Sequence, residues 1–192
     1  MSRNQEIAAY FRDLDRSYFM DSDKELANFD EAIPIGHGQT ISQPSLVLKM
    51  TQLLDLQPES KVLEIGTGSG FQTALLAAFS KEVYTVERIA QLHERARERL
   101  TEAGYRNVHF RMGDGTRGWS EHAPYDRIMV TAAASDVPPE LTSQLSTDGR
   151  MLIPVGGQFM QELLLIEKDR SGKVSQKAFD PVRFVRLRGE YE

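Results

Sequence analysis

Three glycines in the segment LEIGTGSGFQ (residues 63–72) follow a short apolar run with the spacing G-x-G-x-G. Gly66, Gly68 and Gly70 lie where a strand is expected to turn into a helix, the place where open α/β sheets bind ligands. The dinucleotide fingerprint G-x-G-x-x-G needs its third glycine at position 71, where this chain has Phe71. The spacing therefore departs from that of a nicotinamide or flavin site.

Acidic residues near this loop indicate what kind of ligand it holds. Glu64 lies two residues before the first glycine, where a carboxylate would repel a pyrophosphate but not a cationic ligand with an amino group. Glu87 ends the next apolar run, where a carboxylate can accept hydrogen bonds from both ribose hydroxyls. Asp114 follows the third run, beside Met112 and Gly113, and can approach an adenine amino group.

The ligand that fits these residues has a ribose and an adenine, lacks a phosphate and carries a positive charge. S-adenosylmethionine has this description, and we predict it as the cofactor. Tight turns and solvated strand ends would explain each feature separately, but the coincidence of motif, strand and acid favours a cofactor site. The predicted cofactor contacts are Glu64, Gly66, Thr67, Gly68, Ser69, Gly70, Glu87, Arg88, Gly113, Asp114, Gly115 and Thr131.

Alternating strands and helices are expected to position this loop. Apolar runs predict strands over residues 61–66, 82–87, 107–114, 125–133 and 149–156. Helical patterns fill the intervals at residues 71–80, 89–104 and 137–149, the last opened by proline and closed by glycine. The alternation predicts an α/β fold with a doubly wound, mostly parallel, Rossmann-like sheet.

The two ends of the chain depart from this alternation. Ile7, Phe11, Leu14 and Tyr18 recur at the helical period and predict one face of an N-terminal helix. Strand-like runs at residues 161–169 and 177–189 are joined by the turn sequence RSGK, which predicts an antiparallel C-terminal strand pair. We expect one domain over residues 1–192, divided into a helical and substrate-loop segment (1–58), a cofactor-binding core (59–156) and C-terminal strands (157–192).

The segment PIGHGQTISQP (residues 34–44) has three possible roles: a connector, a helix entry or the wall of an active site. Its composition alone favours a connector. Ser42 is a candidate N-cap for a helix that carries Pro44 in its first turn. The apolar face of that helix would consist of Leu46, Val47, Met50, Leu53 and Leu54.

Composition excludes several classes of function. The 192 residues include no cysteine, which excludes disulfides, thiol nucleophiles and thiolate zinc sites, and no histidine pair has metal-ligand spacing. A formal net charge of −5 argues against a nucleic-acid or anionic-membrane partner. The N-terminus is too polar for a signal peptide and no apolar run could span a membrane. We expect a cytoplasmic monomer without a metal.

Six segments occur in the order and at the spacings of one enzyme family: PIGHGQTISQP, VLEIGTGSGFQTALLA, VERI, GDGTRGW, APYDRIMVTAAA and GRMLIPVG. Over about residues 14–189 the chain resembles protein-L-isoaspartate O-methyltransferases. All class I methyltransferases share the glycine loop, whereas PIGHGQTIS with VTAAA is more specific. The resemblance implies a class I methyltransferase sheet, and methyl transfer from S-adenosylmethionine to the carboxylate of L-isoaspartyl and D-aspartyl residues in damaged proteins, which initiates their repair.

The resemblance also assigns residues on the substrate side. Ser42 matches the substrate-contacting serine of the family and is the predicted catalytic residue. Thr40, Ile41 and His37 are predicted substrate-binding neighbours, with His37 supporting the backbone rather than acting as a base. A carboxylate with a pKa near 4 is ionised at neutral pH, so the reaction needs alignment but neither a general base nor a metal.

Three segments depart from the family pattern. LDRSYFMD lacks both prolines of a VPRxxFVP-like segment, ANFDEAIPIG loses a tyrosine and a proline, and FVRL places Arg186 where the family has proline. These changes lie on the substrate side and leave open a methyltransferase of the same lineage that acts on a different carboxylate or on a small molecule. A non-catalytic S-adenosylmethionine-binding protein is a third interpretation, against which Glu87, Asp114 and Ser42 argue.

Overall fold

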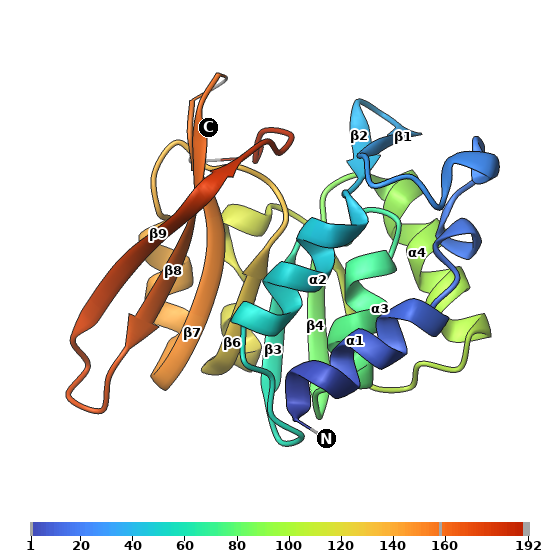
Figure 1. Cartoon of the computed structure of the whole chain (residues 1–192). Coiled ribbons are helices and arrows are strands. Elements are labelled where there is room, and N and C mark those ends of the chain that lie inside the picture. Colours follow the sequence, from blue (N-terminus) through green and yellow to red (C-terminus); the bar gives the residue numbers. More distant parts are fainter. Residues whose placement is uncertain (1, 158, 190–192) are drawn as a thin grey trace.

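The computed structural model describes residues 2–157 and 159–189, and within them a seven-stranded sheet forms the centre of the molecule (Figure 1). The strands are β3 (Lys61–Ile65), β4 (Glu82–Glu87), β5 (Val108–Met112), β6 (Tyr125–Val130), β7 (Leu145–Gly156), β8 (Gln161–Lys168) and β9 (Val174–Val182). Their order is β5-β4-β3-β6-β7-β8-β9; the pairs from β5 to β7 are parallel, and β8 pairs antiparallel with both β7 and β9. The predicted mostly parallel sheet with an antiparallel C-terminal pair is confirmed.

The strand order reverses between β3 and β6, which creates the crevice where doubly wound sheets bind ligands. Ile65 pairs with Val86 on β4 and with Val130 on β6. The segments that follow these three residues therefore leave the sheet at one common edge.

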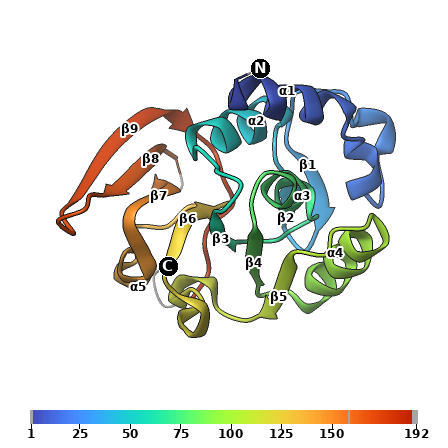
Figure 2. The same ribbon diagram turned by 90° about the horizontal axis from the view of Figure 1, so that it is seen from below.

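Helices cover both faces of the sheet. They are α1 (Arg3–Asp13), α2 (Pro44–Leu53), α3 (Phe71–Ala78), α4 (Ala90–Glu102) and α5 (Pro139–Gln144). Figure 2 shows α1, α2 and α3 on one side of the sheet and α5 on the other. Alternate strand residues enter two apolar clusters, Val62 packing with the first four helices and Leu63 packing on the α5 side. Both faces of the central strands are buried, so these strands are mostly apolar, and Glu64 on β3 and Thr85 on β4 are buried polar exceptions. Within the described residues, no helix is long and apolar enough to cross a membrane.

Two helix predictions were wrong at their ends. The apolar face predicted to extend to Tyr18 stops earlier, because α1 ends at Asp13 and the Asp15 side chain accepts from the Ser17 N–H to begin a separate 3-10 turn, Arg16–Phe19. Tyr18 is 38% exposed rather than buried on that face. The helix predicted for residues 137–149 ends at Gln144, and the following residues already belong to β7.

The last predicted strand, residues 177–189, is also displaced. β9 ends at Val182, and residues 183–188 leave the sheet edge to cross the end of β6. There the Ala133 N–H donates to the Val185 carbonyl, and the Leu187 N–H donates to the Ala133 carbonyl, both at 2.8 Å. We call residues 183–188 the crossing segment.

The segment at residues 34–44 is neither a connector nor a simple helix entry. It forms most of an antiparallel hairpin, β1 (Ile33–Gly36) and β2 (Gln39–Ile41), which no pattern in the sequence analysis had indicated. His37 and Gly38 join the strands with φ values of 55° and 69°, the left-handed pair that a tight type I′ turn requires.

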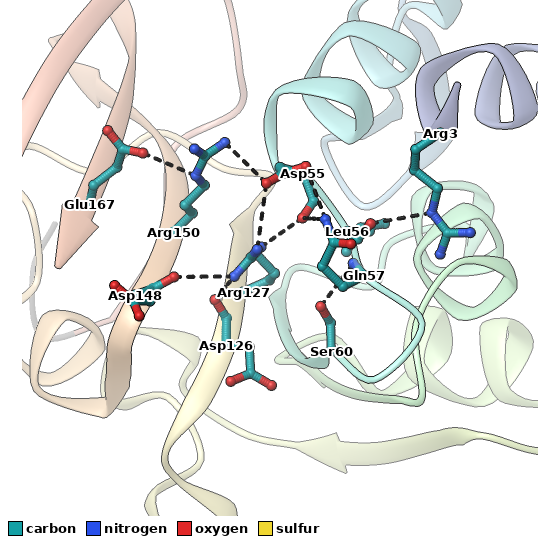
Figure 3. Close-up of polar contacts among 10 residues, drawn as sticks. All are labelled: Arg3, Asp55, Leu56, Gln57, Ser60, Asp126, Arg127, Asp148, Arg150 and Glu167. Atoms are coloured by element: carbon teal, nitrogen blue, oxygen red, sulfur yellow. Dashed lines mark hydrogen bonds and ion pairs between the residues drawn. The ribbon is translucent and has the colours of Figure 1, made fainter. Parts of the chain in front are cut away.

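The edge of the sheet opposite the crevice is held by a buried guanidinium (Figure 3). Arg127, 8% exposed, donates to the carbonyl oxygens of Asp55, Asp126 and Asp148, and lies 3.7 Å from the Asp55 carboxylate. Arg150 also pairs with Asp55, at 3.5 Å. Asp55 lies just after α2, so this cluster fixes the C-terminal end of that helix against β6 and β7.

Replacement of Arg127 by Met should lower the free energy of unfolding by about 2–4 kcal/mol, because partly buried carbonyl oxygens lose their donor and Asp55 loses a partner. Urea unfolding would measure the change. Arg170→Met is the matched control: the pair that Arg170 forms with Asp148 is largely exposed, so its loss should leave stability unchanged. Equal effects of the two substitutions would contradict a structural role for Arg127.

Candidate active site

A cavity opens at the crevice edge, between the hairpin, the glycine loop, the end of β4, and the crossing segment. It brings together eleven of the predicted site residues: Thr40, Ile41, Ser42, Gly66, Thr67, Gly68, Ser69, Glu87, Arg88, Gly115 and Thr131. Its walls also contain residues that sequence reasoning missed: Gln39, Val47, Ile65, Phe71, Gln72, Val86, Ile89, Ala132, Val185, Arg186, Leu187 and Arg188. The aliphatic ones carried no signal beyond that of core residues, whereas Arg186 had been noted only as a departure from the family pattern on the substrate side.

The glycine loop is tied to the strands on both sides. The Thr131 hydroxyl lies 2.7 Å from the Gly66 carbonyl oxygen and 3.0 Å from that of Ile65. A Cβ added at Gly66 would lie 2.5 Å from this hydroxyl, and φ there is +95°, so only glycine fits. The Gly68 N–H donates to Glu87 Oε2 at 3.0 Å.

Glu87 stands at the end of β4 with a side chain suited to a nucleoside. It is 6% exposed, and each carboxylate oxygen accepts one backbone N–H, from Gly68 and, at 2.9 Å, from Ile89. Both oxygens keep lone pairs for further donors, such as vicinal hydroxyls. Val86 and Ile89 add aliphatic surface beside it, on which a flat base can pack.

Glu64 does not face this cavity, which corrects the expectation of a direct ligand contact. Strand alternation places Glu64 on the same face as Val62, where it is fully buried. Its Oε2 accepts from the Thr73 hydroxyl at 2.6 Å and from the Thr85 hydroxyl at 2.7 Å, and Thr85 also bonds to Thr67 of the glycine loop. Burial raises the pKa of Glu64 to about 8, so the carboxyl braces the loop from behind in its neutral form near pH 7.

Three other predicted cofactor residues also lie outside the cavity walls: Gly70, Gly113 and Asp114. Gly70 is the left-handed N-cap of α3 and packs under Leu100. Asp114 Oδ1 accepts from the Thr116 N–H and hydroxyl, which starts the turn after β5. A Cβ added at Gly189 would lie 2.2 Å from that same oxygen, so the chain after the crossing segment covers the Asp114 carboxylate.

A groove of about 1040 Å³ adjoins the cavity on the side of α2 and β9. The residues that line both are Thr40, Ser42, Thr131, Val185 and Arg186, which we call the junction. Thr40 on β2, Ser42 just after it and Thr131 just after β6 thus lie between the two spaces, with the Thr131 hydroxyl bonded to the Gly66 carbonyl oxygen. His37 lies on the exposed turn of the hairpin and lines neither space, contrary to its predicted role in substrate binding.

Ser42 was the predicted N-cap of α2, but the structure does not place it there. Gln43 occupies that position without a side-chain cap, and Asp30 accepts the Ser45 N–H at 2.8 Å in its place. This hydrogen bond holds the pKa of Asp30 below its ordinary value. Among the described residues the Ser42 hydroxyl forms no hydrogen bond, so it is available to a ligand at the junction.

A buried arginine that sequence reasoning missed fixes the backbone of this region. Arg16 is 5% exposed. It donates, over 2.7 to 3.4 Å, to the carbonyl oxygens of Ala27, Phe29, Glu31, Ile41 and Ser42. The loop before the hairpin and the residues after it are therefore held by one side chain. Within the described ranges, no cluster of three or more potential metal ligands occurs.

The whole chain is similar to proteins of one known family. A family model described as protein-L-isoaspartate(D-aspartate) O-methyltransferase (PCMT) matches residues 1–192. A protein of Polaromonas sp. (strain JS666 / ATCC BAA-500), named protein-L-isoaspartate O-methyltransferase 2, is 50% identical over 189 residues, covering 97% of this chain and 90% of its own. A Dictyoglomus turgidum protein named protein-L-isoaspartate O-methyltransferase is 50% identical over 190 residues, covering 98% and 86%.

Solved structures share the fold. A protein-L-isoaspartate O-methyltransferase superposes with a TM-score of 0.88 at 28% identity; the match covers 99% of this chain and 62% of the longer one. A Plasmodium falciparum protein in complex with S-adenosyl-L-homocysteine superposes with a TM-score of 0.83 at 24% identity, covering 97% of this chain and 91% of its own.

The buried Glu64 predicts a pH-dependent stability that Glu64→Gln removes. The ordinary pKa of 4.5 applies to the unfolded chain and the raised value of about 8 to the folded one. Between these values the folded state keeps a proton that the unfolded state releases, so stability falls as pH rises and levels off above about 8. The amide of the variant cannot titrate, so this dependence disappears.

Urea unfolding at pH 5.5 and 7.5 tests this. The wild type should lose about 2 kcal/mol relative to Glu64→Gln between the two pH values. Glu94→Gln, on an exposed helix face, should follow the wild type. Parallel pH profiles for the wild type and Glu64→Gln would show that the buried carboxyl keeps an ordinary pKa.

Proposed function

The chain belongs to the protein-L-isoaspartate(D-aspartate) O-methyltransferase family, and from this membership we propose that it methylates the free carboxylate of L-isoaspartyl and D-aspartyl residues in damaged proteins. The methyl donor is S-adenosylmethionine, and the sheet is that of a class I methyltransferase. Methylation of this carboxylate initiates repair of the damaged residue.

The observation that supports this function most directly is the junction. A cavity suited to a nucleoside and a groove large enough for a peptide meet at the hydroxyls of Thr40, Ser42 and Thr131. A methyl transferase needs this arrangement, because donor and acceptor must approach from separate spaces and come into line at one point.

The cavity residues have chemistry that fits the donor. When bound, S-adenosylmethionine supplies a methyl group on a positively charged sulfur, which is already activated for transfer. Glu87 would accept its ribose hydroxyls, and Gly66 and Gly68 would let the backbone come close to it. Ile35 of the hairpin lies 3.8 Å from a Cβ placed at Gly68, so the hairpin packs against the loop at this point.

On the acceptor side, the chain has to orient a carboxylate rather than activate one. A carboxylate is ionised at neutral pH and attacks without a general base. The Ser42 hydroxyl can donate one hydrogen bond to it, while the backbone of Ser42 is held by Arg16. Alignment of this kind can lower a barrier by about 7–11 kcal/mol.

The activity is tested with a matched pair of peptides that differ only in an isoaspartyl or an aspartyl residue. We expect the purified protein to transfer labelled methyl from S-adenosylmethionine to the isoaspartyl peptide alone, as a base-labile ester. Labelling of both peptides, or of a small carboxylic acid instead, would favour a methyltransferase of the same lineage with another substrate. Cofactor binding without any transfer would contradict the proposal.

Ser42→Ala should lower kcat/KM for the isoaspartyl peptide about tenfold, because one hydrogen bond to the acceptor is lost. The dissociation constant of S-adenosylhomocysteine, measured by calorimetry, should not change. Ser45→Ala is the control, since Ser45 lines the groove but not the cavity. Unchanged turnover of Ser42→Ala would remove Ser42 from the reaction.

A further inference from the structure

Arg186 is the cationic member of the junction. It lies on the crossing segment, where its neighbours Val185 and Leu187 pack against the apolar cluster on the α5 side of the sheet. Arg186 lines both the cofactor cavity and the groove, as Val185 also does, and it is the charged residue of the two. It therefore faces the point where the donor methyl and the acceptor have to meet.

The guanidinium of Arg186 is oriented but not neutralised. One nitrogen, Nη1, donates to the Gly156 carbonyl oxygen at 2.9 Å, at the end of β7. In the described part of the chain, Arg186 forms no ion pair. Lys49, which also lines the groove, is paired with Asp180. A guanidinium has five N–H donors in a planar fork, so at least four remain for a ligand.

Two of the three carboxylates that line the groove are already engaged, and the third, that of Glu31, belongs to an exposed residue. Asp180 is held by Lys49, and Asp30 accepts from the Ser45 N–H and from the Gln43 side chain. Of the cations that line the groove, Arg183 and Arg186 form no ion pair within the described residues, and Arg186 is the one at the junction. A planar fork recognises a carboxylate by two parallel hydrogen bonds, which give direction as well as attraction.

We propose that Arg186 binds the acceptor carboxylate of the substrate and delivers it to Ser42. This proposal rests on the proposed function and names how its substrate is selected. Arg186 holds one face of the carboxylate, leaving a lone pair of the acceptor oxygen directed into the cavity. That oxygen forms the new O–C bond as the methyl C–S bond breaks, its electron pair returning to sulfur, and no proton moves.

Charge changes during this step determine how Arg186 acts on the rate. The acceptor is an anion before transfer and a neutral ester afterwards, so the contact with Arg186 is strongest in the ground state and weakest in the product. Arg186 should therefore lower KM and promote release of the ester. Its removal should raise KM, while kcat stays the same or rises.

The decisive experiment measures binding rather than turnover. The probe is a fluorescent isoaspartyl peptide, compared with the same peptide in which the free carboxylate is a carboxamide. Both are titrated with protein saturated with S-adenosylhomocysteine. The wild type should bind the carboxylate peptide at least about tenfold more tightly than the carboxamide peptide, and in Arg186→Gln this ratio should fall to about one.

Two variants serve as controls. Arg183→Gln removes a cation that lines the groove but not the cavity, and its ratio should equal that of the wild type. Arg186→Lys keeps the charge without the fork, and its ratio should be intermediate. An unchanged urea unfolding midpoint shows that each variant is folded.

The outcomes separate this proposal from the proposed function. If Arg186→Gln weakens the binding of both peptides equally, or of neither, the proposed role of Arg186 is wrong. This holds even if the wild type methylates the isoaspartyl peptide. Loss of the preference for the carboxylate peptide in Arg186→Gln, but not in Arg183→Gln, supports the proposal, whether or not transfer is observed. If the wild type transfers methyl, a rise in KM without a fall in kcat adds independent support.

Discussion

Arg16 places a positive charge beneath the hairpin and surrounds it with five backbone carbonyl oxygens from two stretches of chain. A buried cation without acceptors would be very costly, so the carbonyls have to converge on it. This convergence restricts the backbone conformation of the loop before the hairpin and of the residues at the end of the hairpin. The substrate side of the site thus depends on one guanidinium rather than on a long run of regular hydrogen bonds.

A second guanidinium performs the corresponding task at the other edge of the sheet. Arg127 holds Asp55 just beyond α2, while the loop that Arg16 organises carries Asp30, which caps the beginning of α2. The helix is consequently anchored at both ends through acidic residues in irregular loops. Because α2 follows directly after Ser42, this anchoring fixes the direction in which the junction faces. The sheet, α2 and the hairpin together position Thr40, Ser42 and Thr131, the hydroxyl-bearing residues of the junction.

The parts of the fold that sequence analysis predicted are those in which local pattern and burial agree. The strands near Lys61 and Glu82 were placed almost to the residue, because strands buried on both faces are continuous apolar runs. The glycine loop and Glu87 were found for a related reason, since each directly follows or ends a predicted strand. The hairpin was missed because its strands span only four and three residues and its turn is His-Gly, not the commoner Asn-Gly. Glu64 was assigned to the ligand, although strand alternation turns it toward α3. The role of Arg16 and the path of the crossing segment could not be predicted, because they depend on which backbone carbonyl oxygens and strand ends the fold brings beside them.

The bridge between Ala133 and the crossing segment uses the carbonyl of Val185 and the N–H of Leu187, while neither backbone bond involves Arg186 itself. The backbone of Arg186 therefore takes no part in the two hydrogen bonds that hold the crossing segment against the end of β6. A change of side chain at position 186, even to an imino acid without an N–H, leaves both bonds available. A substitution at this one position can therefore change what the site binds while the backbone that carries it stays in place.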